Sequence, residues 1–220
     1  MQKLLIKGRR EISGSISVSG SKNATLPILA GSILAKDVEL KKVPLVKDIS
    51  TMIELLKFIG IKIRFQNKRK IIQIRNRKKK IKTLAPYKLV KTMRAGVLVL
   101  GPLLTKYRKA KVSLPGGCAI GTRPVDLHLF ALKKLGAKIK IKDGYIVADA
   151  KNGLKGTKIK FPSISVGATE NALLAASGAE GKTELLNCAI EPEIIDLILF
   201  LKKLGSKIKI LGRKIIIIGN

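Results

Sequence analysis

Hydrophobic and polar positions recur in one pattern along this chain of 220 residues. Three segments share the pattern: 48–63, 124–141 and 192–210. Each begins with an acidic residue or a proline and continues with apolar residues at helical spacing. Each then places a glycine (Gly60, Gly136 or Gly205) where a left-handed residue ends a helix, and a strand follows in which Lys and Ile alternate or nearly so. The three glycines are spaced roughly 70 residues apart, so we predict one supersecondary unit that occurs three times.

The residues ahead of these segments complete the unit. Helices rich in Ala and Gly are expected at 22–35, 89–104 and 167–179, and short strands at 38–41, 111–114 and 182–186. The first helices are apolar nearly all round, as in 171–176, and such a helix belongs inside the protein. The dipeptide Asp143-Gly144 is typical of a hairpin turn. We therefore predict an α/β fold of three βαβαββ units, approximately 22–87, 88–160 and 161–220, with buried helices and outer sheets.

Composition narrows the class of protein. Hydrophobic residues make up 46% of the chain, enough for a large core, and the two cysteines do not form a disulfide framework. The sequence has no cluster of Cys and His with zinc-ligand spacing, so no metal is expected. Residues 1–8 do not resemble a signal peptide, and no apolar run approaches the length of a membrane span. We expect a cytoplasmic protein without a membrane segment.

The net charge of +31 raises the question of nucleic-acid binding. Such proteins usually gather Lys and Arg on one face and interleave them with stacking aromatic residues. Here aromatic residues make up 4% of the chain, and lysines are spread over nearly every segment, as in the alternating run 138–142. That alternation indicates strands with a solvated lysine face. We expect nonspecific attraction to polyanions and no specific nucleic-acid partner.

The segment 113–127, S-L-P-G-G-C-A-I-G-T-R-P-V-D-L, is the candidate for chemistry. A glycine-rich turn presents Cys118, and a helix start follows with Thr122 as N-cap and Pro124 at the first helical position. Open N–H groups at a helix start, together with Arg123, favour anions and lower the pKa of a nearby thiol. The alternative is that Cys118 is a small apolar residue that only packs.

Several stretches resemble the UDP-N-acetylglucosamine enolpyruvyl transferase (1-carboxyvinyltransferase) family. They stand in that family's order and spacing at 20–28, 90–95, 114–118, 123–128, 165–169 and 191–196. The resemblance covers essentially the whole chain. It implies one lobe of an inside-out α/β barrel, in which three repeated units surround buried helices. It also implies transfer of the enolpyruvyl group from phosphoenolpyruvate to the 3-hydroxyl of UDP-N-acetylglucosamine, the first committed step of peptidoglycan synthesis.

The resemblance implies roles for particular residues and no cofactor. Lys22, Asn23 and Arg123 are expected to bind phosphoenolpyruvate, and Cys118 is expected to be the catalytic thiol that protonates the enol carbon or bonds to it. The residues expected to bind UDP-N-acetylglucosamine are Asn23, Arg94, Arg123, Pro124, Val125, Asp126, Leu127, Ser163, Ile164, Ser165, Val166 and Gly167. Both substrates are anions, which is why cations are needed near the reacting centre.

Structural alternatives exist for residues of these motifs. Asn23 is also a candidate helix N-cap, and Asp126 favours a helix dipole without a ligand. His128 is interpreted as structural, and Cys188 as a core thiol at the end of a strand. Two acidic residues, 191 and 193, are candidate helix caps. At position 163 the family usually has a lysine where this chain has Ser163, so a phosphate contact is absent or is made by Lys160 instead.

Members of this family have two similar lobes with the substrates bound between them, and this chain corresponds to about the first half. Residues 22–220 are expected to form the lobe of three repeats, and the strands of residues 1–21 to join a second lobe. Activity is then expected to need a second-lobe partner chain. Two alternatives are a non-catalytic fragment that binds a UDP-sugar and, less favoured, an enzyme like 5-enolpyruvylshikimate-3-phosphate synthase, which uses no cysteine in this loop.

Overall fold

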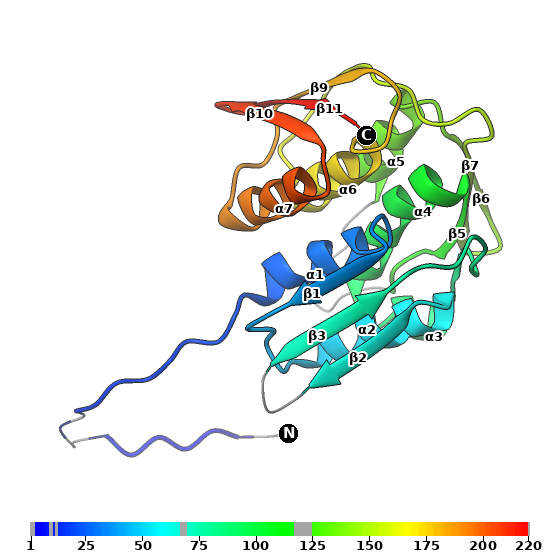
Figure 1. The fold of residues 1–220 in the computed structure, drawn as a ribbon. Helices are drawn as coiled ribbons and strands as arrows, with labels where there is room; N and C mark the ends of the chain where they lie inside the picture. The colour runs from blue at the N-terminus through cyan, green and yellow to red at the C-terminus, as the bar shows by residue number, and fades with distance from the viewer. Residues whose placement is uncertain (1–2, 9–10, 12, 67–69, 117–124, 220) are drawn as a thin grey trace.

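A computed structural model describes residues 3–8, 11, 13–66, 70–116 and 125–219 (Figure 1). Within these ranges the strands form three sheets, which lie on three sides of a group of helices (Figure 1). The first sheet has the order β1-β3-β2 and is built from β1 (Asp37–Leu40), β2 (Lys62–Gln66) and β3 (Ile71–Arg75). Its three strands pair antiparallel.

The other two sheets repeat this arrangement and add one edge strand. The second sheet has the order β4-β5-β7-β6, and the third has the order β10-β11-β9-β8. Their strands are β4 (Leu84–Ala85), β5 (Lys109–Ser113), β6 (Lys138–Lys142), β7 (Tyr145–Asp149), β8 (Lys158–Lys160), β9 (Lys182–Leu186), β10 (Lys207–Leu211) and β11 (Lys214–Ile218). The extra strands β4 and β8 pair parallel with β5 and β9. The predicted three-unit α/β fold is confirmed, and the described first sheet has no equivalent of β4 or β8.

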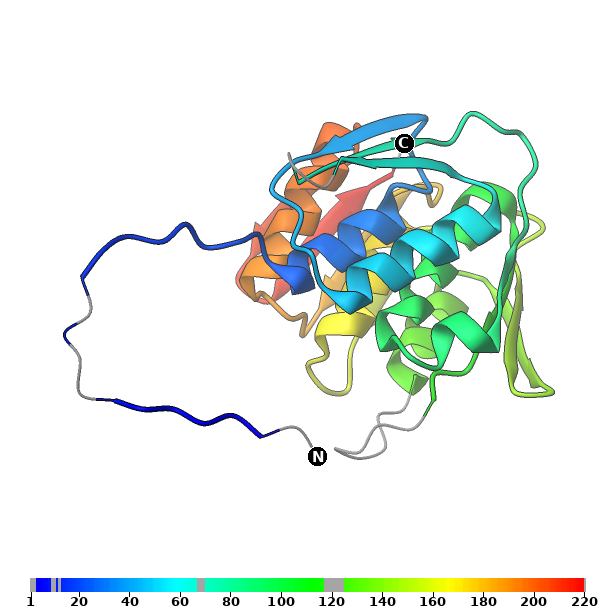
Figure 2. The same cartoon turned by 90° about the horizontal axis from the view of Figure 1, so that it is seen from below.

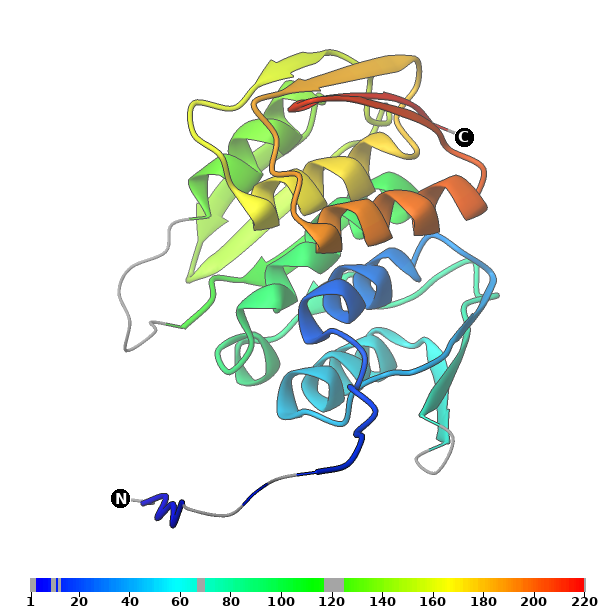
Figure 3. The ribbon, with the colours of Figure 1, turned by 90° about the vertical axis from the view of Figure 1, so that its left-hand side faces the viewer.

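The helices lie between the sheets, as predicted. They are α1 (Lys22–Gly31), α2 (Lys47–Ile59), α3 (Tyr87–Val90), the 3-10 helix η2 (Arg94–Val99), α4 (Leu100–Tyr107), α5 (Asp126–Lys134), α6 (Val166–Ala176) and α7 (Pro192–Lys203). Figure 2 shows α1 and α2 side by side, and Figure 3 shows α6 and α7 beneath the third sheet. In α6 every residue from Ala168 to Ala176 is buried, because the helix packs against α4, α5 and α7.

The three repeated glycines end their helices as predicted. Gly60, Gly136 and Gly205 have φ values of +110°, +98° and +106°, a backbone conformation that costs glycine little. After each glycine the next N–H bonds the carbonyl five residues earlier, as Ile61 does to Leu56 at 3.0 Å. This is the Schellman motif, which satisfies the last carbonyls of a helix. The same local signal therefore ends the outer helix in all three units.

Some predicted boundaries were wrong. The expected helix 89–104 is divided into α3, η2 and α4, because Gly96 packs closely on Val90 and Pro102 cannot donate a helical hydrogen bond. The helix expected to begin at Pro124 begins at Asp126. Because β4 and β8 belong to the second and third sheets, those sheets begin at Leu84 and Lys158, a few residues before the expected unit boundaries.

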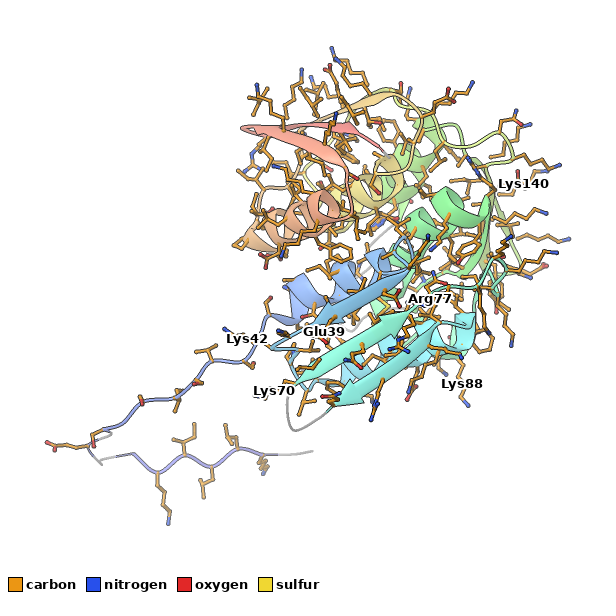
Figure 4. The ribbon with its side chains drawn as sticks, viewed as in Figure 1. Glu39, Lys42, Lys70, Arg77, Lys88 and Lys140 are labelled. Atoms are coloured by element: carbon orange, nitrogen blue, oxygen red, sulfur yellow. The ribbon has the colours of Figure 1, made fainter. Side chains whose placement is uncertain are left out.

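Lysine side chains point outward from many elements. Lys88 and Lys140, which belong to α3 and β6, both extend into solvent in Figure 4, and Lys42 and Lys70 lie near the first sheet. Glu184 is one of the few acidic residues among them, and hydrogen bonds from Lys182 and Lys214 hold its pKa near 2. In the described part of the chain, no helix is long and apolar enough to cross a bilayer. Among the same residues, no group of three or more Asp, Glu, His or Cys side chains could hold a metal ion.

Candidate functional site

A cavity of about 500 Å³ lies where the start of α6, the 3-10 helix η2 and the start of α5 meet. Its lining comes from four separate parts of the chain. The residues are Arg94, Ala95, Val97, Leu98, Pro115, Val125, Leu127, His128, Ser165, Val166, Gly167 and Glu170. We call it the η2–α6 cavity. Its lining combines apolar side chains with a few polar groups, the composition typical of a small-molecule site.

The cavity brings together three of the stretches predicted to bind UDP-N-acetylglucosamine. Arg94 comes from η2, Val125 and Leu127 flank the start of α5, and residues 165–167 begin α6. Other predicted residues of this group are not in its lining. Asp126 is exposed in the first turn of α5, and Ser163 and Ile164 are exposed ahead of α6. The tertiary structure thus gathers part of the predicted set.

The start of α6 supplies hydrogen-bond donors. Ser165 is the N-cap, and its hydroxyl accepts from the Ala168 N–H at 3.3 Å. The remaining N–H groups of a first helical turn, with the positive end of the helix dipole, favour a negatively charged ligand. A Cβ at Gly167 would lie 3.1 Å from Cε1 of the His128 ring, a tight contact that glycine avoids. This close approach brings the His128 ring against the helix start.

Asn171 fixes the orientation of His128. The Asn171 Oδ1 accepts from the Gly101 N–H at 2.9 Å, and its Nδ2 donates to the Val97 carbonyl at 3.2 Å. The same Nδ2 lies 3.2 Å from Nδ1 of His128. Because an amide nitrogen can only donate, Nδ1 of His128 accepts and the ring proton is on Nε2. Asn171 therefore ties α6 to η2, α4 and α5 at one point.

His128 is neutral at physiological pH. Burial and, to a smaller extent, the positive charge of Arg94 lower its pKa to about 4. The interpretation of His128 as a structural residue was incomplete, because the ring also lines the cavity. With Nδ1 occupied by Asn171, the N–H at Nε2 is the donor that His128 has left for a ligand.

Glu170 was not singled out from the sequence. Its side chain lies on α6 in the cavity lining and is only 6% exposed, and burial followed by the charge of Glu193 raises its pKa to about 8. The sequence signal that could have identified Glu170 is that it is an ionisable residue in a helix that is otherwise apolar nearly all round. At neutral pH Glu170 is a carboxylic acid and so a hydrogen-bond donor.

The residues predicted at the start of α1 lie outside this lining. Lys22 forms an ion pair with Asp48 at 3.2 Å, and Asn23 is exposed. The interpretation of Asn23 as N-cap was wrong, because Ser21 occupies that position and accepts from the Ala24 N–H at 3.2 Å. The sequences 21–25 and 165–169 share the pattern Ser-x-x-Ala-Thr, so α1 and α6 begin with the same cap.

The thiol motif falls outside the described residues. Cys118, Thr122, Arg123 and Pro124 all belong to the segment 117–124, which the structure does not describe. Pro115 lies shortly before this segment and Val125 directly follows it, and both line the η2–α6 cavity. The prediction that Cys118 is catalytic stays a prediction.

The remaining interpretations have mixed outcomes. Cys188 is confirmed as a core thiol, since it is fully buried and burial raises its pKa to about 12. Glu191 stands at the N-cap of α7 without a capping hydrogen bond from its side chain, and Glu193 lies in the first turn. Lys160 lies beside a different surface hollow, with Lys158 and Arg213.

The polar part of the cavity wall has one chemical character. Arg94 is a cation, His128 presents an N–H, and Glu170 carries a proton. The first turn of α6 contributes backbone N–H groups. Such a wall favours a ligand rich in acceptor oxygens, above all an anion.

The sequence matches known proteins over most of its length. A profile of EPSP synthase (3-phosphoshikimate 1-carboxyvinyltransferase) matches residues 6–220. The UDP-N-acetylglucosamine 1-carboxyvinyltransferase of Pelagibacter ubique (strain HTCC1062) is 60% identical over 210 residues, which are 95% of this chain and 50% of that protein. The protein of the same name from Rickettsia prowazekii (strain Madrid E) is 52% identical over 219 residues, 99% of this chain and 52% of that protein.

Solved structures agree on the fold. The enolpyruvyl transferase NikO from Streptomyces tendae superposes with a TM-score of 0.81 at 19% identity, over 94% of this chain and 48% of that one. The EPSP synthase of Acinetobacter baumannii gives a TM-score of 0.75 at 20% identity, over 94% and 47%. The chain spans about half the length of the curated relatives it matches. It belongs to the EPSP synthase (3-phosphoshikimate 1-carboxyvinyltransferase) family and resembles, over that half, the UDP-N-acetylglucosamine 1-carboxyvinyltransferases.

Proposed function

We propose that this chain forms the first half of a UDP-N-acetylglucosamine 1-carboxyvinyltransferase and acts in the cytoplasm in peptidoglycan precursor synthesis. In the reaction the sugar 3-hydroxyl oxygen bonds to C2 of phosphoenolpyruvate, the bond from C2 to the phosphate oxygen breaks, and inorganic phosphate leaves as hydrogen phosphate, which carries in net terms the proton that the hydroxyl gives up. The observation that carries this proposal is the η2–α6 cavity. It gathers Arg94, Val125, Leu127 and residues 165–167 at a helix start suited to anions.

The sugar nucleotide is proposed to bind in this cavity. Arg94 and the first turn of α6 face its diphosphate, and Val125 and Leu127 contribute apolar contact. Asn23, Arg123, Pro124, Asp126, Ser163 and Ile164 complete the proposed contacts, by resemblance to the family. The protonated Glu170 and neutral His128 in the wall support an anionic ligand, because neither carries a negative charge at neutral pH.

Phosphoenolpyruvate is proposed to bind beside Lys22, Asn23 and Arg123, and the positive charges of Lys22 and Arg123 offset its carboxylate and phosphate. The Lys22 ammonium is paired with Asp48 and is about half exposed, so an incoming anion replaces or joins that carboxylate. Cys118 is proposed to protonate the enol carbon or to add to C2, two roles that suit a thiol of lowered pKa. The proposed reaction uses no metal or organic cofactor.

The site is proposed to be completed by a second lobe. Residues 3–8, 11 and 13–19 extend away from the body in Figures 1 and 2 and form no strand there. Their apolar side chains are exposed, among them Leu4 at 86% and Ile16 at 93%. Apolar side chains in such a segment favour pairing with a further sheet, and residues 1–21 are assigned here to the second lobe.

The test compares the chain alone with the chain plus a complementary second-half chain. The chain alone is expected to bind UDP-N-acetylglucosamine weakly and to release no phosphate from phosphoenolpyruvate, because rate comes from enclosing both substrates in one site. Addition of the second half is expected to restore phosphate release. In that assembly Cys118→Ser and Arg94→Ala should abolish most activity, whereas the buried control Cys188→Ser should keep it.

Three outcomes discriminate between the functions. Phosphate release by the chain alone would contradict the half-enzyme proposal. Binding of the sugar nucleotide without any release in the assembly would favour a non-catalytic UDP-sugar-binding fragment. A preference for shikimate 3-phosphate over UDP-N-acetylglucosamine would move the chain to the EPSP synthase reaction.

A further inference from the structure

Glu170 is the one buried carboxyl in the η2–α6 cavity, and the proposed reaction leaves it without a role. The residue is 94% buried, yet its carboxyl has no hydrogen bond or ion pair within the described residues. The side-chain oxygens that are both unpartnered and fully enclosed belong to Thr183 and Glu191. The Glu170 oxygens are not among them, and Glu170 lines the cavity.

Unpartnered buried carboxyls are rare, because desolvation without a hydrogen bond costs about 1–3 kcal/mol or more. A carboxyl that keeps this arrangement at a cavity wall is suited to a ligand that supplies the missing partner. Its surroundings decide what that partner is. Arg94 and the first turn of α6 attract an anion to the same cavity, and an ionised carboxylate there would repel it.

We propose that Glu170 is a ligand-binding residue, which acts as a neutral carboxylic acid and donates a hydrogen bond to an acceptor oxygen of the sugar nucleotide. The inference rests on the proposed function, and it adds that the cavity binds its ligand only while Glu170 carries a proton. Glu170 is thus a specificity residue that selects an acceptor oxygen over a donor group at this point of the ligand.

The charged and titratable groups around Glu170 are consistent with this state. On the elements packed against α6 they are Glu193 of α7, His128 of α5 and Arg94 of η2. The cations of α1, α4 and β11 are engaged elsewhere, since Lys22 pairs with Asp48, Lys106 donates to three carbonyls and Lys214 pairs with Glu184. Burial and Glu193 together raise the pKa of Glu170 to about 8, so the acid form dominates at neutral pH.

The expected effect follows from the fraction of protonated Glu170. If only that form binds, the apparent Kd is the intrinsic Kd divided by this fraction, which is about 0.9 at pH 7 and about 0.1 at pH 9. Binding should therefore weaken about tenfold between these pH values. Ligand binding raises the pKa of Glu170 in turn, because the two equilibria are linked.

The experiment measures the Kd of UDP-N-acetylglucosamine for the full chain by calorimetry at several pH values from 6 to 9.5. The matched variant is Glu170→Gln, which keeps the shape and a donor but cannot ionise. The Kd of Glu170→Gln should change little between pH 7 and 9. Ionisation of the uracil ring of the ligand near the upper end of this range affects wild type and variant equally. Glu193→Gln should lower the pKa of Glu170 and move the weakening of binding to lower pH.

A carbon-13 titration of glutamate carboxyls provides a second readout that needs no activity. The Glu170 resonance is identified as the one that is present in wild type and absent from Glu170→Gln. In wild type it should titrate near pH 8 without ligand and at a higher pH with ligand bound. Titration of that resonance among the ordinary carboxyls would overturn the proposal, as would an equal pH dependence of binding in wild type and Glu170→Gln. Absence of UDP-N-acetylglucosamine binding to wild type at every pH would overturn this inference, whereas the proposed function itself is overturned only when the chain assembled with a second half also fails to bind the sugar nucleotide.

Discussion

Replacement of Asn171 by alanine tests whether one buried amide holds the cavity together. Asn171 is fully buried and joins α6 to two neighbouring backbones, through the Gly101 N–H at 2.9 Å and the Val97 carbonyl at 3.2 Å. It also holds Nδ1 of His128. In Asn171→Ala these groups lose their partner in a region that water does not reach freely.

The magnitude follows from which groups are left unpaired. A buried polar group without a partner costs about 1–3 kcal/mol. The Val97 carbonyl keeps the hydrogen bond from the Leu100 N–H, and His128 borders the cavity, where water can replace the amide. The loss is therefore expected at about 2–3 kcal/mol, mostly from the Gly101 N–H and the void that the shorter side chain leaves.

The assay is urea denaturation at 25 °C followed by circular dichroism. A loss of this size shifts the midpoint by about 1 M urea without a change in slope. Asn152→Ala is the matched control, because Asn152 is exposed in the turn after β7 and its removal is expected to change stability by less than about 0.5 kcal/mol. A loss below about 1 kcal/mol in Asn171→Ala would refute the assignment of Asn171 as the hydrogen-bonding centre of the core.

Three further predictions concern pH, packing and charge. Wild type should lose stability relative to His128→Gln in thermal unfolding as the pH drops from about 6.5 towards about 4, because unfolded His128 binds a proton in this window while the folded chain keeps its pKa near 4; the opposite dependence from Glu170, whose folded pKa is about 8, is common to both proteins and cancels in the comparison. Gly156→Ala should lose more than about 2 kcal/mol in urea denaturation, since the new Cβ would lie 2.4 Å from the Lys182 carbonyl oxygen; Gly8→Ala, with open space around it, should lose none. Binding to duplex DNA should be independent of sequence and should fall by about a thousandfold or more between 50 and 200 mM salt in a fluorescence anisotropy titration. A sequence preference at physiological salt would refute the prediction that the net charge attracts polyanions nonspecifically.

Local signals in the sequence predicted much of the fold. The glycines at 60, 136 and 205 end helices because a left-handed residue is a local requirement that glycine meets at least cost. The hairpin at Asp143-Gly144 forms with φ values of 51° and 74° for the same reason. Helix interiors were less predictable. The division of 89–104 into three pieces depends on how closely Gly96 and Val90 pack, which periodicity does not report.

The sequence by itself determined the family and the threefold repeat and supplied the motifs proposed for the site, because these rest on residue identity and on signals within a few residues of one another. Tertiary structure alone decided which motifs share the η2–α6 cavity and which of their side chains lie outside it. It also decided the states of His128 and Glu170, whose pKa values move in opposite directions from their ordinary values to about 4 and about 8. The physical reason is that burial disfavours the charged form of each, and burial is set by helices distant in sequence.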